Sequence, residues 1–126
     1  MSLGLIGKKI GMTRHFDKEA GSAITVTVID VTGNELVQRK TADGKDGYNA
    51  VQVAYSDQKD QRMKQPALGH LKKNGVAAKR IIREFRVDDG EELPESHPGA
   101  ELFQVDQWGD VIGTTKGKGF QGVVKR

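Results

Sequence analysis

The sequence predicts a mainly β protein, a small antiparallel β-barrel with one short helical insertion. Apolar residues recur with a period of two in several short runs, as in strands with one buried face. Glycine supplies 16 of the 126 residues and punctuates these runs, at about twice its usual frequency. One stretch in the middle of the chain instead shows a helical pattern. Many short strands with glycine turns, together with one helical segment, favour a small barrel.

The first half of the chain contains the clearest strands. Residues 3–16 are strand-like but are interrupted by glycines, which in strands mark bulges or close backbone approach. Residues 22–31 alternate strongly and then change face, which predicts either a strand covered on both sides or a bulge. Thr32-Gly33-Asn34 is a turn signal. Residues 35–40 and 48–55 are the next strands, and we expect an antiparallel meander here.

The second half begins with the helix. Pro66 can open it, because a first-turn residue needs no N–H donor. Asn74-Gly75 is a stop signal, and Lys72 and Lys73 precede it at the negative end of the helix dipole. We therefore expect a short helix over residues 66–74. Further strands are expected at residues 81–87, 101–105 and 110–115.

Charge is distributed in blocks, although the net charge is only +3. Residues 61–86 carry eight basic and one acidic side chains, residues 87–110 carry eight acidic and no basic ones, and residues 111–126 carry four basic and no acidic ones. The +7 block is either a polyanion-facing surface or a solvated helix face balanced by the acidic block. The predicted organisation is a barrel portion at 1–60 and 81–115, a basic helical insertion at 61–80, and the start of a basic Gly/Lys-rich extension at 116–126.

Signals of catalysis are weak. The chain has no cysteine, and its three histidines (His15, His70 and His97) lack metal-ligand spacing. The carboxylates Asp88, Asp89, Glu91 and Glu92 have no apolar neighbours that would tune them for acid–base chemistry. Gly117 begins a GxGxxG match, but only four residues follow it, too few for a dinucleotide fold. No apolar run approaches the ~20 residues of a membrane span. We expect no enzyme activity, cofactor, metal, membrane or small-molecule substrate.

The binding signal is stronger. In residues 114–126 lysines alternate with glycines, so the backbone can approach a phosphate closely while lysine neutralises it. Phe120 could stack on a base. Gly7-Lys8-Lys9-Ile10-Gly11-Met12-Thr13-Arg14 repeats this pattern near the other end. The alternative is a flexible tail with incidental lysines, but two such segments favour polyanion binding.

Several motifs in order resemble the family of bacterial large-subunit ribosomal protein number three, ribosomal protein L3, in its N-terminal portion. The resemblance is collinear over the whole chain, and its first and last motifs are the most specific. The matching residues are Gly4 to Arg14, Ala23 to Val31, Asp46 to Val53 with "DGY", Gly69-His70 with Lys73 and Gly75-Val76, Glu84-Phe85-Arg86, Gly90-Glu91-Glu92, and Gly113 to Gly122.

The resemblance implies a structural protein that binds 23S ribosomal RNA directly, early in large-subunit assembly. It implies a translation-protein-like barrel, an extension that runs through ribosomal RNA towards the peptidyl transferase centre, contacts with neighbouring large-subunit ribosomal proteins, and a cytoplasmic location in the ribosome. The candidate RNA-binding residues are Lys8, Lys9, Arg14, Lys72, Lys73, Lys79, Arg80, Lys116, Gly117, Lys118, Gly119, Phe120, Lys125 and Arg126.

Two expectations qualify this assignment. Family members continue well beyond residue 126, so we expect the chain to be a fragment and its barrel to be incomplete. The alternative function is a non-catalytic β-barrel that binds protein partners through the acidic residues 87–110.

Overall fold

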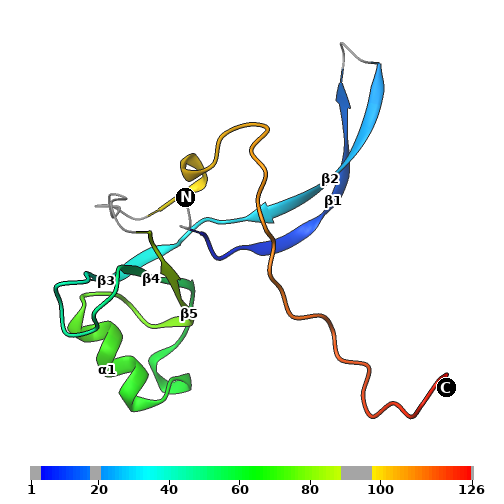
Figure 1. Cartoon of the computed structure of the whole chain (residues 1–126). Helices are drawn as coiled ribbons and strands as arrows, with labels where there is room; N and C mark the ends of the chain where they lie inside the picture. Colours follow the sequence, from blue (N-terminus) through cyan, green and yellow to red (C-terminus); the bar gives the residue numbers. More distant parts are fainter. Residues whose placement is uncertain (1–3, 18–20, 89–97, 126) are drawn as a thin grey trace.

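The computed structural model describes residues 4–17, 21–88 and 98–125. These residues form two antiparallel sheets, one α-helix and two short 3₁₀ turns. Figure 1 shows a two-stranded hairpin that projects from a unit of three strands and the helix, while the C-terminal segment runs away as extended chain. The prediction of a mainly β chain with a short helix is confirmed.

The projecting hairpin consists of β1 (Lys8–Asp17) and β2 (Ser22–Asp30). The register pairs Arg14 with Thr25 and shifts between Lys9 and Gly11. The change of face in residues 22–31 predicted either a bulge or a strand covered on both sides. The structure has a bulge, and it lies in β1, opposite the end of β2. Most hairpin side chains are exposed, including Ile10 and Phe16.

The second sheet has the order β3 (Glu35–Lys40), β4 (Ala50–Asp57) and β5 (Lys79–Arg86). β4 lies in the centre, and Val51, Val53 and Ala54 are fully buried there. Because successive side chains alternate between faces, this burial of neighbours shows that both faces of β4 are covered. One face packs Val51 and Val53 with Val87, Ile6, Leu36 and Phe85, and the other packs Ala54 with Val37, Leu71, Val76, Met63 and Ile82.

Helix α1 (Gln65–Lys73) covers the second of these faces through Leu68 and Leu71. The helix has proline at its start, as predicted. At its end Gly75 has φ +73°. The Gly75 N–H donates to the Lys72 carbonyl and the Val76 N–H donates to the Leu71 carbonyl, both at 3.1 Å. This is a Schellman motif, which satisfies carbonyls that the helix leaves unpaired.

Asn34 redirects the chain between the two sheets. Its side chain is buried, with Nδ2 donating to the Val31 and Ile6 carbonyls at 2.6 and 2.9 Å and Oδ1 accepting from the Ile6 N–H at 3.1 Å. Gly33 adopts φ +80° beside it. The expected meander is therefore wrong in one pairing: β2 pairs with β1 instead of β3, because the Asn34 turn leads the chain out of the first sheet.

Two predicted strands are also wrong. Residues 110–115 pair with no described strand, and Val111 and Ile112 are 83% and 97% exposed. Alternation alone forms no strand without a ladder partner and an apolar face to bury. Residues 101–105 instead overlap a 3₁₀ turn, Ala100–Leu102. Across the described residues the two sheets stay separate and enclose no barrel.

Candidate nucleic-acid interface

The hairpin presents three of the predicted cations. Lys8, Lys9 and Arg14 are all exposed on β1, and none forms an ion pair with a described residue. Strand alternation puts Arg14 on the same face as Met12 and Phe16, which are 60% and 69% exposed. This face therefore offers a guanidinium between two apolar side chains, with Thr25 opposite. Such a surface can neutralise a phosphate and also contact a sugar or base.

The helical segment presents further cations. Lys73 and Arg80 are exposed and have no ion-pair partner among the described residues. Lys72 lies 3.0 Å from Asp60, but both side chains are more than half exposed. An exposed pair of this kind contributes little to stability, so Lys72 can exchange its partner for a phosphate.

Lys79 requires a correction to the predicted set. It is 4% exposed and is held by Glu35 and Asp57, each at 2.6 Å. Burial disfavours its charged form, but the hydrogen bonds to Asp57 and Glu35 outweigh burial and raise the pKa of Lys79. A buried ammonium with two carboxylate partners stabilises the sheet and has no free face for a phosphate, so we remove Lys79 from the candidate contacts.

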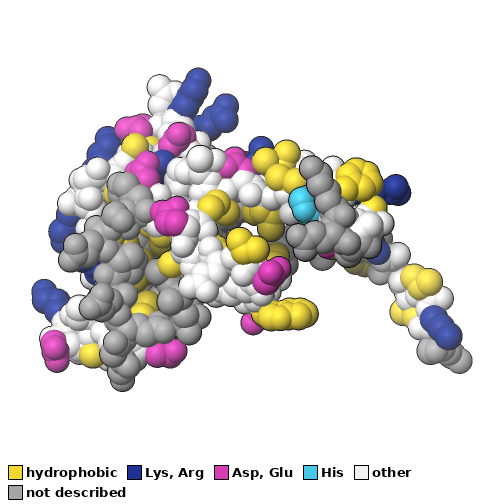
Figure 2. Space-filling model, turned by 90° about the horizontal axis from the view of Figure 1, so that it is seen from above, with side chains coloured by type: hydrophobic (Ala, Val, Ile, Leu, Met, Phe, Trp, Pro, Cys, Tyr) yellow, Lys and Arg dark blue, Asp and Glu magenta, His cyan; other side chains and the backbone are white. Residues whose placement is uncertain are grey.

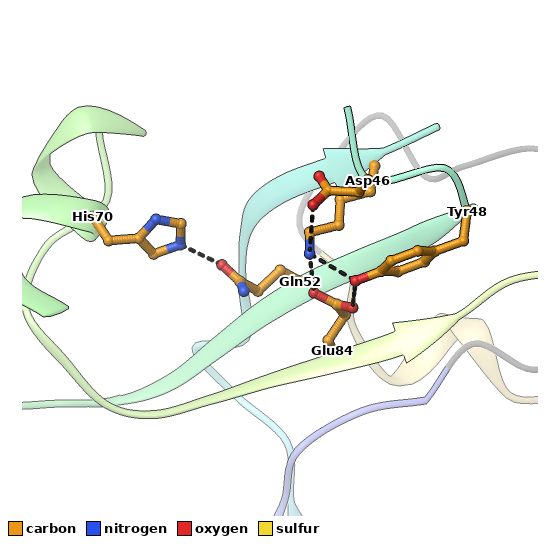
Figure 3. A network of polar contacts seen from close by, with 6 residues as sticks. Asp46, Tyr48, Gln52, His70 and Glu84 are labelled. Atoms are coloured by element: carbon orange, nitrogen blue, oxygen red, sulfur yellow. Dashed lines mark hydrogen bonds and ion pairs between the residues drawn. The ribbon is translucent and has the colours of Figure 1, made fainter. Parts of the chain in front are cut away.

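Lys40 is likewise bound in a polar network, and Figure 3 labels its partners Asp46, Tyr48 and Glu84. Its ammonium lies 2.8 Å from Glu84 and 3.7 Å from Asp46, and it donates to the Tyr48 hydroxyl at 2.8 Å. The Tyr48 hydroxyl donates to Glu84 at 2.7 Å. Bonds from Lys40 and then Tyr48 lower the pKa of Glu84, while Glu84 and then Tyr48 raise the pKa of Lys40. Lys40 is thus committed within the fold.

The Tyr48 ring extends this network, and His70 forms a separate contact close by. The centroid of the ring lies 5.0 Å from the Lys40 ammonium and 4.9 Å from the Arg86 guanidinium, both at cation–π distance. His70 hydrogen-bonds through Nε2 to Gln52, which ties α1 to β4. Sequence patterns predicted no structural role for these residues, because their partners lie far along the chain. The "DGY" and "GH" motifs mark two of the residues but do not reveal the contacts.

The C-terminal segment presents the predicted Gly/Lys residues. Lys116, Gly117, Lys118, Phe120 and Lys125 are all exposed, and Phe120 is exposed in full. Gly119 has φ +71°, a conformation that favours glycine. The predicted contact Arg126 lies outside the described residues, as do the carboxylates of residues 89–97.

The candidate residues therefore occupy three places: the hairpin, the helix with the start of β5, and the C-terminal segment. Figure 1 shows that the C-terminus lies away from both α1 and the hairpin tip, so these places form no single continuous surface. Figure 2 shows hydrophobic side chains open to solvent between Lys and Arg side chains on one face. The exposed hydrophobic side chains of the hairpin and the C-terminal segment include Met12, Phe16, Ile24, Trp108, Ile112 and Val124.

Other kinds of site find little support in the described part of the chain. It holds no group of three or more His, Asp or Glu side chains placed to bind a metal ion. No helix in it is long and apolar enough to cross a membrane. An open hollow of about 230 Å³ is lined by Lys8, Asp30, Tyr55, Asp57 and Lys79, among others. Two of the charged residues that line this hollow, Lys79 and Asp57, already pair with each other within the fold.

Fold and surface together define a class: a small, mainly β protein with exposed cations on its hairpin, on the helix and β5, and in a glycine-rich C-terminal segment. The family model for ribosomal protein L3 matches residues 5–126, and the chain belongs to this family. It is 56% identical over 129 residues to large ribosomal subunit protein uL3 of Akkermansia muciniphila. It is 52% and 48% identical to the uL3 proteins of Laribacter hongkongensis and Burkholderia orbicola.

The matches cover all of this chain and 60%, 59% and 59% of these relatives. The chain thus spans about three fifths of the relatives' length, and it corresponds to their N-terminal part. The resemblance stated from the sequence motifs is confirmed.

Proposed function

We propose that this chain is a structural constituent of the large ribosomal subunit that binds 23S ribosomal RNA directly and helps to nucleate subunit assembly. The single observation that carries the proposal is the family membership over residues 5–126. The exposed cations of the hairpin, helix and C-terminal segment support it, because exposed lysine and arginine side chains are available to neutralise phosphates.

The C-terminal segment is the strongest RNA contact in this proposal. Its lysines alternate with glycines that leave the backbone open, since a Cβ built on Gly117 or Gly122 meets no atom within 4 Å. Phosphate oxygens can therefore approach the backbone N–H groups between two ammonium groups. Phe120 is free to stack on a base. This segment is the start of an RNA-penetrating extension.

We also propose that the two sheets are parts of one small translation-protein-like barrel. The exposed apolar residues on the hairpin support this, because an isolated two-stranded hairpin is marginally stable and needs a covered face. A barrel would use 1–60 and 81–115, with 61–80 as a basic insertion and 116–126 as the extension.

The proposed role requires no catalytic group, metal or cofactor. It places the protein in the bacterial cytoplasm as part of the ribosome, beside other large-subunit proteins. The cations proposed to contact RNA are those of the predicted set other than Lys79.

The test is a salt titration of binding to an in vitro transcript of bacterial 23S rRNA. Affinity should fall steeply with salt, because each neutralised phosphate releases counterions. Replacing Lys116 and Lys118 with alanine should shallow the slope of log K against log salt by about 0.7–0.9 for each phosphate that is no longer neutralised. A flat salt response, with protein partners retained after RNase treatment, would instead identify a protein-interaction module.

A further inference from the structure

The exposed face of α1 has a glycine at its centre. At about 100° per residue, Gln65, Pro66, Lys72 and Lys73 all fall within about 60° of Gly69 around the helix axis. These residues are exposed, whereas Leu68 and Leu71, about 100° and 160° from Gly69 around the axis, are buried. Lys72 and Lys73 lie one turn beyond Gly69, one on each side of it.

Nothing among the described residues requires glycine at this position. A Cβ built on Gly69 meets no atom within 4 Å, and the backbone does not have the positive φ that favours glycine. Glycine inside a helix costs about 1 kcal/mol relative to alanine. In a helix of nine residues this is a substantial loss. The described residues therefore give no reason for glycine at position 69, and the helix face around it is exposed to solvent.

The charge around Gly69 selects the kind of partner. Arg62, Lys64, Lys72 and Lys73 are exposed cations on and just before the helix. The first turn of α1 contains no acidic residue. The short 3₁₀ turn before the helix, Asp60–Arg62, contributes one carboxylate, that of Asp60, which pairs with Lys72. This surface complements an anionic backbone that crosses the helix.

We propose that the phosphate backbone of the bound RNA crosses α1 at Gly69, between Lys72 and Lys73. The absent side chain lets the backbone approach the helix closely enough for both ammonium groups to reach phosphate oxygens. Gly69 is thus a positioning residue and Asp60 a competitor for Lys72. This inference rests on the proposed function and adds a specific docking point to it.

The first variant is Gly69→Ala, tested for binding to a 23S rRNA transcript at about 0.15 M salt. Its thermal midpoint should equal or exceed that of the original chain, because alanine favours the helix and has open space. Its affinity should fall roughly fivefold if one of the two lysines no longer reaches a phosphate and roughly thirtyfold if neither does. Gly69→Gln should bind more weakly still.

Two further variants complete the test. Gly109→Ala is the matched control, because Gly109 also has open space for a Cβ and no positive φ; it should leave affinity unchanged. Asp60→Asn should tighten RNA binding, because it releases Lys72 from its carboxylate partner.

The outcomes separate the two proposals. If the original chain shows no salt-dependent binding to the transcript, the proposed function itself fails. If it binds and Gly69→Ala binds equally well, the docking point is wrong. A lower thermal midpoint for Gly69→Ala would contradict the open space on which the inference rests. Loss of a protein partner that survives RNase treatment, with RNA affinity unchanged, would assign this face to protein.

Discussion

Replacing Lys79 with methionine separates structural cations from RNA-binding ones. Lys79 and Lys73 are both lysines of the basic block and both were candidate RNA contacts, yet the structure gives them opposite roles. Lys79 is 4% exposed and bonded to Glu35 and Asp57 at 2.6 Å, whereas Lys73 is exposed. Methionine keeps most of the aliphatic stem of lysine, so Lys79→Met removes the charge and little packing.

The expected loss of stability follows from the exposure of the two carboxylates. Removing one partner of a fully buried ion pair costs about 3–5 kcal/mol. Here the Glu35 side chain is 31% exposed and that of Asp57 is 87% exposed, so water can solvate both in part. We therefore expect a loss of about 2 kcal/mol. For a chain of this size that lowers the thermal midpoint by about 8 °C.

The assay is thermal and urea unfolding followed by circular dichroism. Lys73→Met is the matched control and should unfold within about 0.5 kcal/mol of the original chain. RNA affinity, measured under conditions in which both variants are folded, should be unchanged for Lys79→Met and reduced for Lys73→Met. If Lys79→Met unfolds like the original chain and loses RNA affinity, Lys79 is a phosphate contact and its assignment to the fold is wrong.

Two further predictions concern the network and the helix end. The pKa of Glu84 is lowered from 4.5 in the folded state, so its contribution to stability is present above this pH and is lost as the pH falls through the folded-state pKa. Urea unfolding should therefore show a larger difference between the original chain and Glu84→Gln at pH 7 than at pH 3; equal differences would contradict the network. Gly75→Ala should cost about 1 kcal/mol, because alanine is strained at positive φ, and Gly75→Asn should cost less in the same assay.

Local signals predicted the helix well. Pro66 and the Asn74-Gly75 stop act through the residues next to them, and both ends of α1 lie within one residue of the predicted ends. The strands β3, β4 and β5 also overlap the strands predicted at residues 35–40, 48–55 and 81–87. Local structure of this kind can be predicted because the residues that determine it are close together in the sequence.

Contacts between residues that lie far apart in the sequence could not be predicted. Nothing in the sequence indicates that Lys79 contacts Glu35 and Asp57. From the sequence alone, Lys79 therefore cannot be distinguished from Lys73. The Thr32-Gly33-Asn34 turn was predicted, but not that Asn34 bonds back to Ile6 and separates β2 from β3. Residues 110–115 have the alternation of a strand, but a strand also needs a neighbour. The candidate site was therefore predicted as a set of cations, while the structure decides which are free.

The most direct test of the proposed RNA-binding role is a map of crosslinks between this chain and 23S ribosomal RNA in a reconstituted particle. We predict crosslinks in the hairpin at Lys8, Lys9 or Arg14, on α1 beside Gly69, and in residues 116–120, with none at Lys79. A map without RNA crosslinks in these three segments, or with its strongest crosslink at Lys79, would contradict this role for the exposed cations.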